Sequence, residues 1–179
     1  MIDEEKKALR KKVKFLKSQI SFEDKKKKSE IIFSRVEDLD CFKKSKVVML
    51  YWSMDDEVNT HDFVIKWSKK KQIILPSVNG DRLELKEFSG LNKLVPGQRY
   101  NIPEPKGELF TQTGKIDIII VPGVAFDKNN KRMGRGKAYF DKLLSKSNSM
   151  KIGVCFDFQF FDKVPTDKFD VKMDMVIHD

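Results

Sequence analysis

A series of short apolar runs limits the possible folds of this chain more than any other feature. The runs are rich in β-branched and aromatic residues, which favours buried strands. They occupy residues 46–53, 73–75, 117–121, 152–156 and 173–177. Because segments of helical composition separate them, the chain is predicted to fold as an α/β protein with a mostly parallel sheet. In such sheets ligands bind beyond the carboxyl ends of the strands, which directs attention to the loops after Trp52, Val121 and Phe156.

Amphipathic periodicity and capping residues predict the helices. One helix face in the first twenty residues carries Leu9, Val13, Leu16 and Ile20. Ser21 with Asp24 is typical of a capping box and predicts a second helix at residues 22–36. Thr60 is expected to cap a helix at residues 61–71.

The middle of the chain has a weaker pattern. Pro76 is expected to end the strand at residues 73–75, and residues 82–88 alternate as an exposed or edge strand does. Residues 90–115 are rich in Gly, Pro and polar side chains and are predicted to form an irregular loop, which is often functional in a compact domain. A helix is expected at residues 137–145.

Length, cysteines and charge narrow the class of protein. A chain of 179 residues suits one domain, residues 1–179, and no apolar run approaches the ~20 residues of a membrane span. Cys41 and Cys155 form no CxxC pair, so a reducing cytoplasm is the simplest compartment. The net charge of +9 fits nucleic acid, an anionic membrane or a polyanionic small molecule. Lysine runs at residues 25–28 and 69–71 fall in helical stretches and are interpreted as solvated faces.

The segment richest in possible chemistry runs from residue 121 to residue 141. It follows the clearest strand, leads into a helix and contains three of the nine glycines, Gly123, Gly134 and Gly136. Glycine lets the backbone approach a ligand closely, and N–H groups at a helix start bind phosphate. Basic side chains add positive charge here: Arg132, Arg135 and Lys137. The spacing fits neither a Walker loop nor a dinucleotide fingerprint, and a basic surface turn without a ligand remains the alternative.

The same segment, VPGVAFDKNNKRMGRGKAYFD, resembles the hallmark of the 5-formyltetrahydrofolate cyclo-ligases, also called methenyltetrahydrofolate synthetases. Further matches lie at the Lys6–Arg10 pair and at residues 53–60, 101–105 and 169–174, so the resemblance covers nearly the whole chain in order. The chain departs from the family pattern at three positions. Ala138 and Asn130 stand where glycine is usual, and Phe140 replaces a tyrosine, although Asn tolerates left-handed backbone.

The resemblance implies a three-layer α/β/α sandwich and an ATP-driven reaction. The formyl oxygen of 5-formyltetrahydrofolate would be phosphorylated, and the neighbouring folate amine would then close a ring to give 5,10-methenyltetrahydrofolate, ADP and phosphate. Mg²⁺ is the expected cofactor and ATP the co-substrate. The folate is expected with or without a polyglutamate tail, and the protein as a cytoplasmic monomer with no nucleic-acid or membrane partner. Two rival functions are a nucleic-acid-binding module and another ATP-using enzyme on the same fold, such as a kinase of a small acid.

The resemblance also implies roles for individual residues. ATP would bind to Lys6, Lys7, Ala8, Leu9, Arg10, Arg132, Met133, Gly134, Arg135, Gly136, Lys137, Ala138, Tyr139 and Phe140. Arg135 and Lys137 would be catalytic, and the folate would contact Trp52, Glu57, Arg135 and Tyr139. Asp141 and Asp170 would bind magnesium, whose sites often combine one or two carboxylates with phosphates. His61 and His178 show no metal-ligand spacing and are interpreted as structural.

Overall fold

The structure, a computed structural model, describes residues 1–99 and 101–179. Its helices are α1 (Ile2–Ser18), α2 (Phe22–Asp38), α3 (Asp40–Lys44), α4 (His61–Trp67) and α5 (Tyr139–Leu144). Its strands are β1 (Val47–Met49), β2 (Gln72–Asn79), β3 (Arg82–Glu87), β4 (Leu94–Pro96), β5 (Pro103–Pro105), β6 (Ile118–Pro122), β7 (Ala125–Asp127), β8 (Arg132–Met133), β9 (Met150–Val154), β10 (Phe160–Phe161) and β11 (Met175–Ile177). None of the helices in these ranges is both long enough and apolar enough to cross a bilayer.

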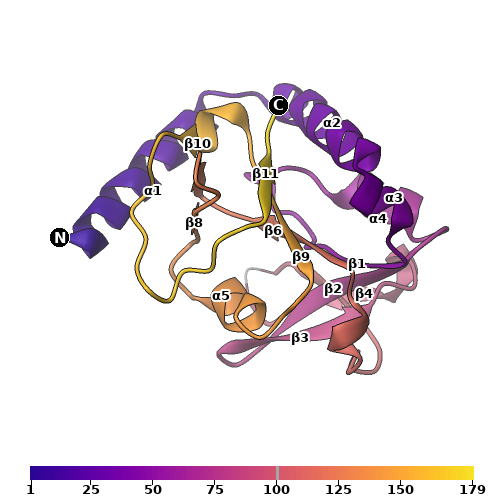
Figure 1. The fold of residues 1–179 in the computed structure, drawn as a ribbon. Helices are drawn as coiled ribbons and strands as arrows, with labels where there is room; N and C mark the ends of the chain where they lie inside the picture. The colour runs from indigo at the N-terminus through magenta and orange to yellow at the C-terminus, as the bar shows by residue number, and fades with distance from the viewer. Residues whose placement is uncertain (100) are drawn as a thin grey trace.

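Six strands form the central sheet in the order β11-β9-β6-β1-β2-β3 (Figure 1). All neighbouring pairs are parallel except β2 and β3, so the prediction of a mostly parallel sheet is confirmed. From β1 the chain builds the sheet first toward β3 and then, through β6, toward β11. The boundary between β1 and β6 is therefore a topological switch point, where ligands bind in open α/β sheets.

Alternate residues of the strands fill two cores, one on each face of the sheet. Val48 and Leu50 face α2, α3 and α4, whereas Val47 and Met49 face the side that carries α5. This alternation follows from the two-residue period of a strand. Figure 1 shows α2, α3 and α4 together on one side and α5 on the other, as expected for a three-layer sandwich.

Pro76 does not end its strand, contrary to the prediction, because β2 continues through it to Asn79. The carbonyl of Ile74 accepts from the Leu50 N–H at 2.9 Å, so that side of β2 faces β1. Backbone groups two residues further along face the same side, and β1 already ends at Met49. Pro76 has no N–H group, but that group would point past the end of β1, where no neighbouring strand could accept a hydrogen bond from it.

Two local predictions fail and two succeed. Thr60 precedes α4, but its hydroxyl donates to the Tyr51 carbonyl at 2.6 Å instead of capping the helix. The loop at residues 90–115 contains the short hairpin β4–β5. Ser21 does cap α2, because its Oγ accepts from the Asp24 N–H at 3.0 Å. Asn130 has φ +61°, the left-handed backbone expected there.

Candidate active site

Two hollows meet at the carboxyl end of the central sheet. The first, called the apolar hollow, is lined by Tyr51, Trp52, Met54 and Glu57 after β1, by Pro76, Val78 and Leu83 of the β2–β3 hairpin, by Ile102 and Glu104, by Pro122 and Gly123 at the end of β6, and by Arg132, Gly134, Arg135 and residues 137–141. It lies at the switch point between β1 and β6. The loop after Phe156, which the sequence also indicated, contributes no residue to its lining.

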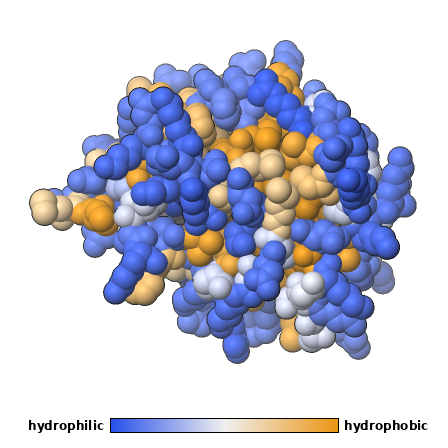
Figure 2. All heavy atoms as spheres, viewed as in Figure 1, coloured by the Kyte–Doolittle hydropathy of each residue, from blue (hydrophilic) through white to orange (hydrophobic). Residues whose placement is uncertain are grey.

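The second, called the charged hollow, is lined by Asp3, Lys6 and Arg10 of α1, by Gly134, Gly136 and Ala138, by Asp141, Lys142 and Ser145 of the α5 region, and by residues 167–171. Gly134, Ala138 and Asp141 line both hollows. Residues 132–141, called the glycine–arginine segment or the wall, thus border both spaces where they meet. Figure 2 views the face drawn in Figure 1, where hydrophilic side chains cover most of the surface and apolar residues gather near its middle.

The segment does not run directly from the buried strand into the helix, as the sequence suggested. A small hairpin, β7–β8, lies between β6 and α5 and pairs with β10. Arg132 lies on β8, which fixes its backbone. The glycine–arginine segment therefore starts from β8, a strand of the small sheet formed by β10, β7 and β8.

Arg132 is buried at the base of the wall. Its side chain is 3% exposed, and its Nη1 lies 3.7 Å from Asp141 Oδ2. Among the described residues, neither Nε nor Nη1 of Arg132 has a hydrogen-bond partner. Burial lowers the pKa of Arg132 although Asp141 opposes this effect. A Cβ at Gly134 would lie 2.9 Å from Arg132 Nη1, so a side chain there would require this guanidinium to shift.

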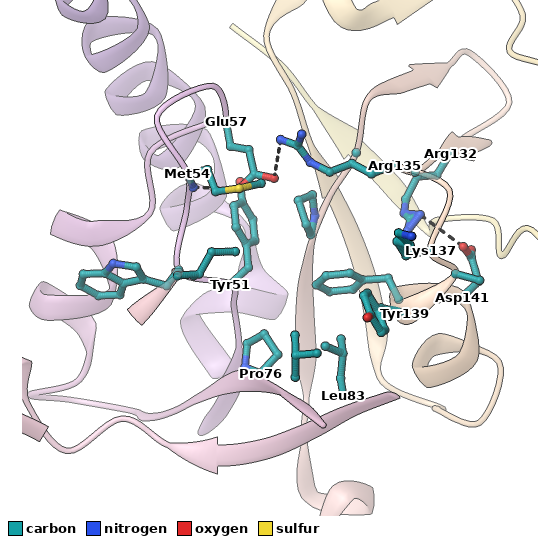
Figure 3. A pocket seen from close by; sticks show the side chains of 18 of the residues that line it. Tyr51, Met54, Glu57, Pro76, Leu83, Arg132, Arg135, Lys137, Tyr139 and Asp141 are labelled. Carbon is teal, nitrogen blue, oxygen red and sulfur yellow. Dashed lines mark hydrogen bonds and ion pairs between the residues drawn. The ribbon is translucent and has the colours of Figure 1, made fainter. Parts of the chain in front are cut away.

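Glu57 lies at the other end of the apolar hollow and faces Arg135 (Figure 3). Arg135 Nη2 donates to Glu57 Oε1 at 3.2 Å and to the two oxygens of Asp56 at 2.7 and 2.9 Å. Glu57 Oε2 also accepts from the Met54 N–H at 3.0 Å. Burial raises the pKa of Glu57, and the Met54 hydrogen bond and Arg135 only partly oppose it. A buried carboxyl of this kind suits recognition of polar groups on a flat heterocycle.

Lys6 and Arg10 lie one helical turn apart and both face the charged hollow. Lys6 Nζ donates to Asp167 Oδ2 and Asp170 Oδ2, each at 2.6 Å. Arg10 Nε donates to the Gly134 carbonyl at 3.1 Å. Burial lowers the pKa of Lys6, but its hydrogen bonds to the two carboxylates outweigh this and leave that pKa raised.

The other predicted ATP residues fall into two groups. Lys7 and Ala8 are exposed and, like Leu9 and Met133, line neither hollow. Met133 is buried under α1 beside Val13. The remainder, from Gly134 to Phe140, line one or both hollows.

Ala138, which departs from the family pattern, has left-handed backbone with φ +55°. It immediately precedes α5. Gly136, two residues earlier, has φ +96°. The usual glycine at position 138 is thus explained by conformation, because only glycine adopts this region without strain.

The predicted magnesium residues, Asp141 and Asp170, both line the charged hollow. Asp141 Oδ1 accepts from the Val171 N–H at 3.1 Å, and Asp170 is bound to Lys6. No group of three or more potential ligands gathers anywhere in residues 1–99 and 101–179. Two carboxylates beside a cationic wall fit a hard cation that takes most of its ligands from phosphate and water.

Trp52 and His61 form a stacked pair, with ring centroids 4.0 Å apart. His61 Nε2 lies 2.9 Å from the Ser53 carbonyl, which fits its predicted structural role. Tyr139 donates to the Gly80 carbonyl at 3.2 Å and so connects the wall to the β2–β3 turn.

Several polar residues of the site were not identified from the sequence, among them Asp56, Lys17 and Glu104. Asp56 binds Arg135, and Lys17 binds Asp56. Glu104 lines the apolar hollow and accepts from Ser77 Oγ at 2.5 Å and the Val78 N–H at 2.9 Å. Asp56 and Glu104 had a usable signal, since they lie in the family-like segments at residues 53–60 and 101–105, whereas Lys17 had none.

A doubly wound sheet with hollows at its switch point defines the class of α/β enzymes that bind small ligands beyond their strands. The model of the 5-formyltetrahydrofolate cyclo-ligase family matches residues 2–179. The chain therefore belongs to the 5-formyltetrahydrofolate cyclo-ligase family, as its sequence segments indicated.

Individual relatives agree with this assignment. A solved structure of Aquifex aeolicus 5,10-methenyltetrahydrofolate synthetase is 37% identical with a TM-score of 0.87, covering 97% of this chain and 89% of that one. The Mycoplasma pneumoniae 5,10-methenyltetrahydrofolate synthetase has a TM-score of 0.77 at 26% identity, covering 96% and 97% of the two chains. A Caenorhabditis elegans protein named probable 5-formyltetrahydrofolate cyclo-ligase is 29% identical over 99% of this chain and 94% of its own length.

Proposed function

We propose that this protein converts 5-formyltetrahydrofolate to 5,10-methenyltetrahydrofolate with Mg²⁺ and ATP, releasing ADP and phosphate. The observation that carries the proposal is the wall shared by the two hollows. Gly134, Ala138 and Asp141 border both spaces, so a nucleotide on one side and a folate on the other would meet there. Phosphoryl transfer depends mainly on such positioning and on neutralised charge.

The charged hollow is proposed to hold the triphosphate. Lys6 and Arg10 line it from α1 and supply cations, and arginine can donate two parallel hydrogen bonds to a phosphate. Arg132 borders the apolar hollow and lies beside Asp141, which lines both hollows. Among the described residues its buried guanidinium has unfilled donors, which is costly unless a ligand fills them, so Arg132 is proposed to bind a phosphate oxygen where the two hollows meet. Lys6 would then exchange part of its contact with Asp170 for phosphate oxygens.

The apolar hollow is proposed to hold the reduced pterin. Tyr51, Trp52 and Leu83 offer apolar surface, while Glu57 offers a carboxyl to the polar edge of the ring. Arg135 and Lys137 on the wall are proposed to lie beside the reacting formyl group and the γ-phosphoryl group. Both roles fit side chains that stabilise negative charge without forming a covalent bond.

The chemistry requires an activated formyl oxygen. The formyl oxygen attacks the γ-phosphorus, the bond between that phosphorus and the β,γ-bridging oxygen breaks, and ADP leaves. The folate N10 then forms a bond to the formyl carbon, loses its proton to solvent, and the carbon–oxygen bond breaks to release phosphate. Arg135 and Lys137 would neutralise charge in both steps. Mg²⁺, bound by Asp141 and Asp170, would neutralise phosphate charge when present.

The test is the ATP-dependent appearance of methenyltetrahydrofolate absorbance, with ADP measured in the same sample. Equal amounts of product and ADP are expected, and none without ATP. Lys137→Ala should lower kcat by about 10²-fold, the usual cost of losing one such charge-stabilising group. Wild-type turnover in that variant would refute the role of Lys137, and absence of product with the wild-type protein would refute the proposed function.

That the chain forms a single domain and that the protein is a monomer both stay predictions.

A further inference from the structure

Lys17 is a buried lysine that the proposed chemistry does not use. It lies in the last turn of α1, and its side chain is only 8% exposed. Burial lowers the pKa of its ammonium, and the nearby Asp56 carboxylate only partly opposes this. Lysines on helix surfaces are normally solvated, and burying their charge is unfavourable unless it has a partner.

The partner of Lys17 leads directly to the wall between the hollows. Lys17 Nζ donates to Asp56 Oδ2 at 3.2 Å. The same carboxylate accepts from Arg135 Nη2 at 2.7 and 2.9 Å. Asp56 therefore lies between two cations that come from α1 and from the glycine–arginine segment.

Charge balance explains why both cations are needed. Asp56 is adjacent to Glu57, and Arg135 Nη2 contacts both carboxylates. Without Lys17, one guanidinium would have to balance two carboxylates in a half-buried space. Burial would raise the pKa of Asp56, but Lys17 and Arg135 outweigh it and hold that pKa below its ordinary value.

These contacts also leave part of Arg135 free for a substrate. All three contacts to carboxylates use Nη2, and within the described part of the chain Nη1 and Nε have no recorded hydrogen-bond partner. A guanidinium is planar, so fixing Nη2 fixes the direction of the other donors. The helix that carries Lys17 is itself held, because Val13 is buried against Val124 and Met133.

We propose that Lys17 and Asp56 are positioning residues, which hold the Arg135 guanidinium in its working orientation beside Glu57. This inference rests on the proposed function, because it assigns Arg135 its task in that reaction. Neither residue touches the substrate in this account: Lys17 acts through Asp56, and Asp56 acts through Arg135. A loose Arg135 would lose the preorganisation on which charge stabilisation depends.

The experiment combines Lys17→Met with Arg135→Lys and measures kcat and KM for each substrate, together with the Tm. Lys17→Met should lower kcat/KM for 5-formyltetrahydrofolate by about tenfold or more, the cost of a lost charged hydrogen bond. Lys17→Arg should restore most of it. The double variant should be no worse than Arg135→Lys alone, because the first change acts only through Arg135.

Lys71→Met is the matched control. Lys71 is also tied to the protein interior, through the Phe42 and Ser45 carbonyls at 2.8 and 2.6 Å, but lines neither hollow. It should change the Tm, leave kcat and KM unchanged, and combine multiplicatively with Arg135→Lys. A purely structural Lys17 would behave in the same way.

Each outcome is decisive. Unchanged kcat/KM in Lys17→Met, or a double variant whose loss is the product of the two single losses, would overturn the positioning role. If Lys17→Met does not fold, Asp56→Asn replaces it in the same double-mutant cycle. Asp56→Asn should also lower kcat/KM for 5-formyltetrahydrofolate, and adding it to Arg135→Lys should cause no further loss. An unchanged kcat/KM, or losses that multiply, would overturn the positioning role. Lack of turnover in the wild-type protein would overturn the proposed function itself, and this inference with it.

Discussion

Arg132 Nη1 lies 3.7 Å from Asp141 Oδ2, in a position where both side chains are almost closed to solvent. The distance is too long for a hydrogen bond, so the pair attracts without using up the donors of the guanidinium. Figure 3 shows the two side chains facing one another beside Lys137. In the proposed function, this arrangement would leave a buried cation available to an anionic ligand where the two hollows meet.

Arg132→Lys tests that interpretation. Lysine keeps the charge but loses the planar set of donors, so KM for ATP should rise about tenfold or more. The thermal stabilisation of the protein by Mg-ATP should shrink in parallel. Arg35→Lys is the control, because Arg35 lies on α2 and contacts the His178 carbonyl. An unchanged KM for ATP in Arg132→Lys would contradict the role of Arg132.

Ala138→Gly should stabilise the protein. Ala138 has φ +55°, and an L-residue in left-handed backbone costs about 1 kcal/mol relative to glycine. A rise in Tm of about 2–4 °C is expected for a chain of this size. Asn130→Gly, at φ +61°, should give a smaller gain or a loss, since Asn tolerates this region and its Nδ2 donates to the Asp174 carbonyl at 3.2 Å. Thermal unfolding of both variants measures the difference, and equal gains would contradict the argument.

Glu57→Gln should stabilise the protein at neutral and alkaline pH, but not in acid. The pKa of Glu57 is raised, first by burial, so the folded state binds its proton more tightly than the unfolded state does. The stability that Glu57 contributes is therefore fully present below the pKa that its carboxyl has in the unfolded state. It is lost as the pH rises through the higher pKa of the same carboxyl in the folded state. The Tm of Glu57→Gln minus that of the wild type should be positive at about pH 8 and vanish at about pH 4. A difference that stays constant across this range would show that Glu57 is not destabilised by its charge.

Asp141→Ala should raise the Mg²⁺ concentration required for turnover by about tenfold or more, since one carboxylate ligand is lost. Chelation of Mg²⁺ should stop turnover by the wild-type protein, and added Mg²⁺ should restore it. Asp162→Ala is the control, because Asp162 is an exposed carboxylate paired with Lys128 at 2.6 Å and neither residue lines a hollow. Identical Mg²⁺ titrations for Asp141→Ala and the wild type would exclude Asp141 as a ligand.

The sequence predicted the inner strands of the sheet well because strands such as β1 and β6 are buried on both faces. Residues 118–121 are all buried in β6, and continuous apolar runs are a strong local signal. The hairpin β7–β8 was missed because it contains strands of three and two residues, too short for a period to be visible. Pro76 was misjudged because its effect depends on where β1 ends, which no local pattern shows.

The site residues, like the strands, were predicted where the signal is local in the sequence and missed where it depends on the fold. Glycines, arginines and Asp141 lie close together in sequence, so their common location was visible as a motif. Lys17 was missed because it meets Asp56 only through the fold. Asp56 lies beside Glu57 in the family-like segment at residues 53–60, but its contact with Arg135 is also made only by the fold. A lysine on an amphipathic helix is normally exposed, and nothing local distinguishes Lys17 from its neighbours.

In the proposed reaction the γ-phosphoryl group passes directly to the formyl oxygen where the two hollows meet, beside Gly134, Ala138 and Asp141. The most direct measurement uses 5-formyltetrahydrofolate labelled with ¹⁸O in its formyl group, followed by mass spectrometry of the phosphate released during turnover. The account predicts one ¹⁸O atom in each phosphate. Phosphate without the label, formed together with methenyltetrahydrofolate, would contradict it.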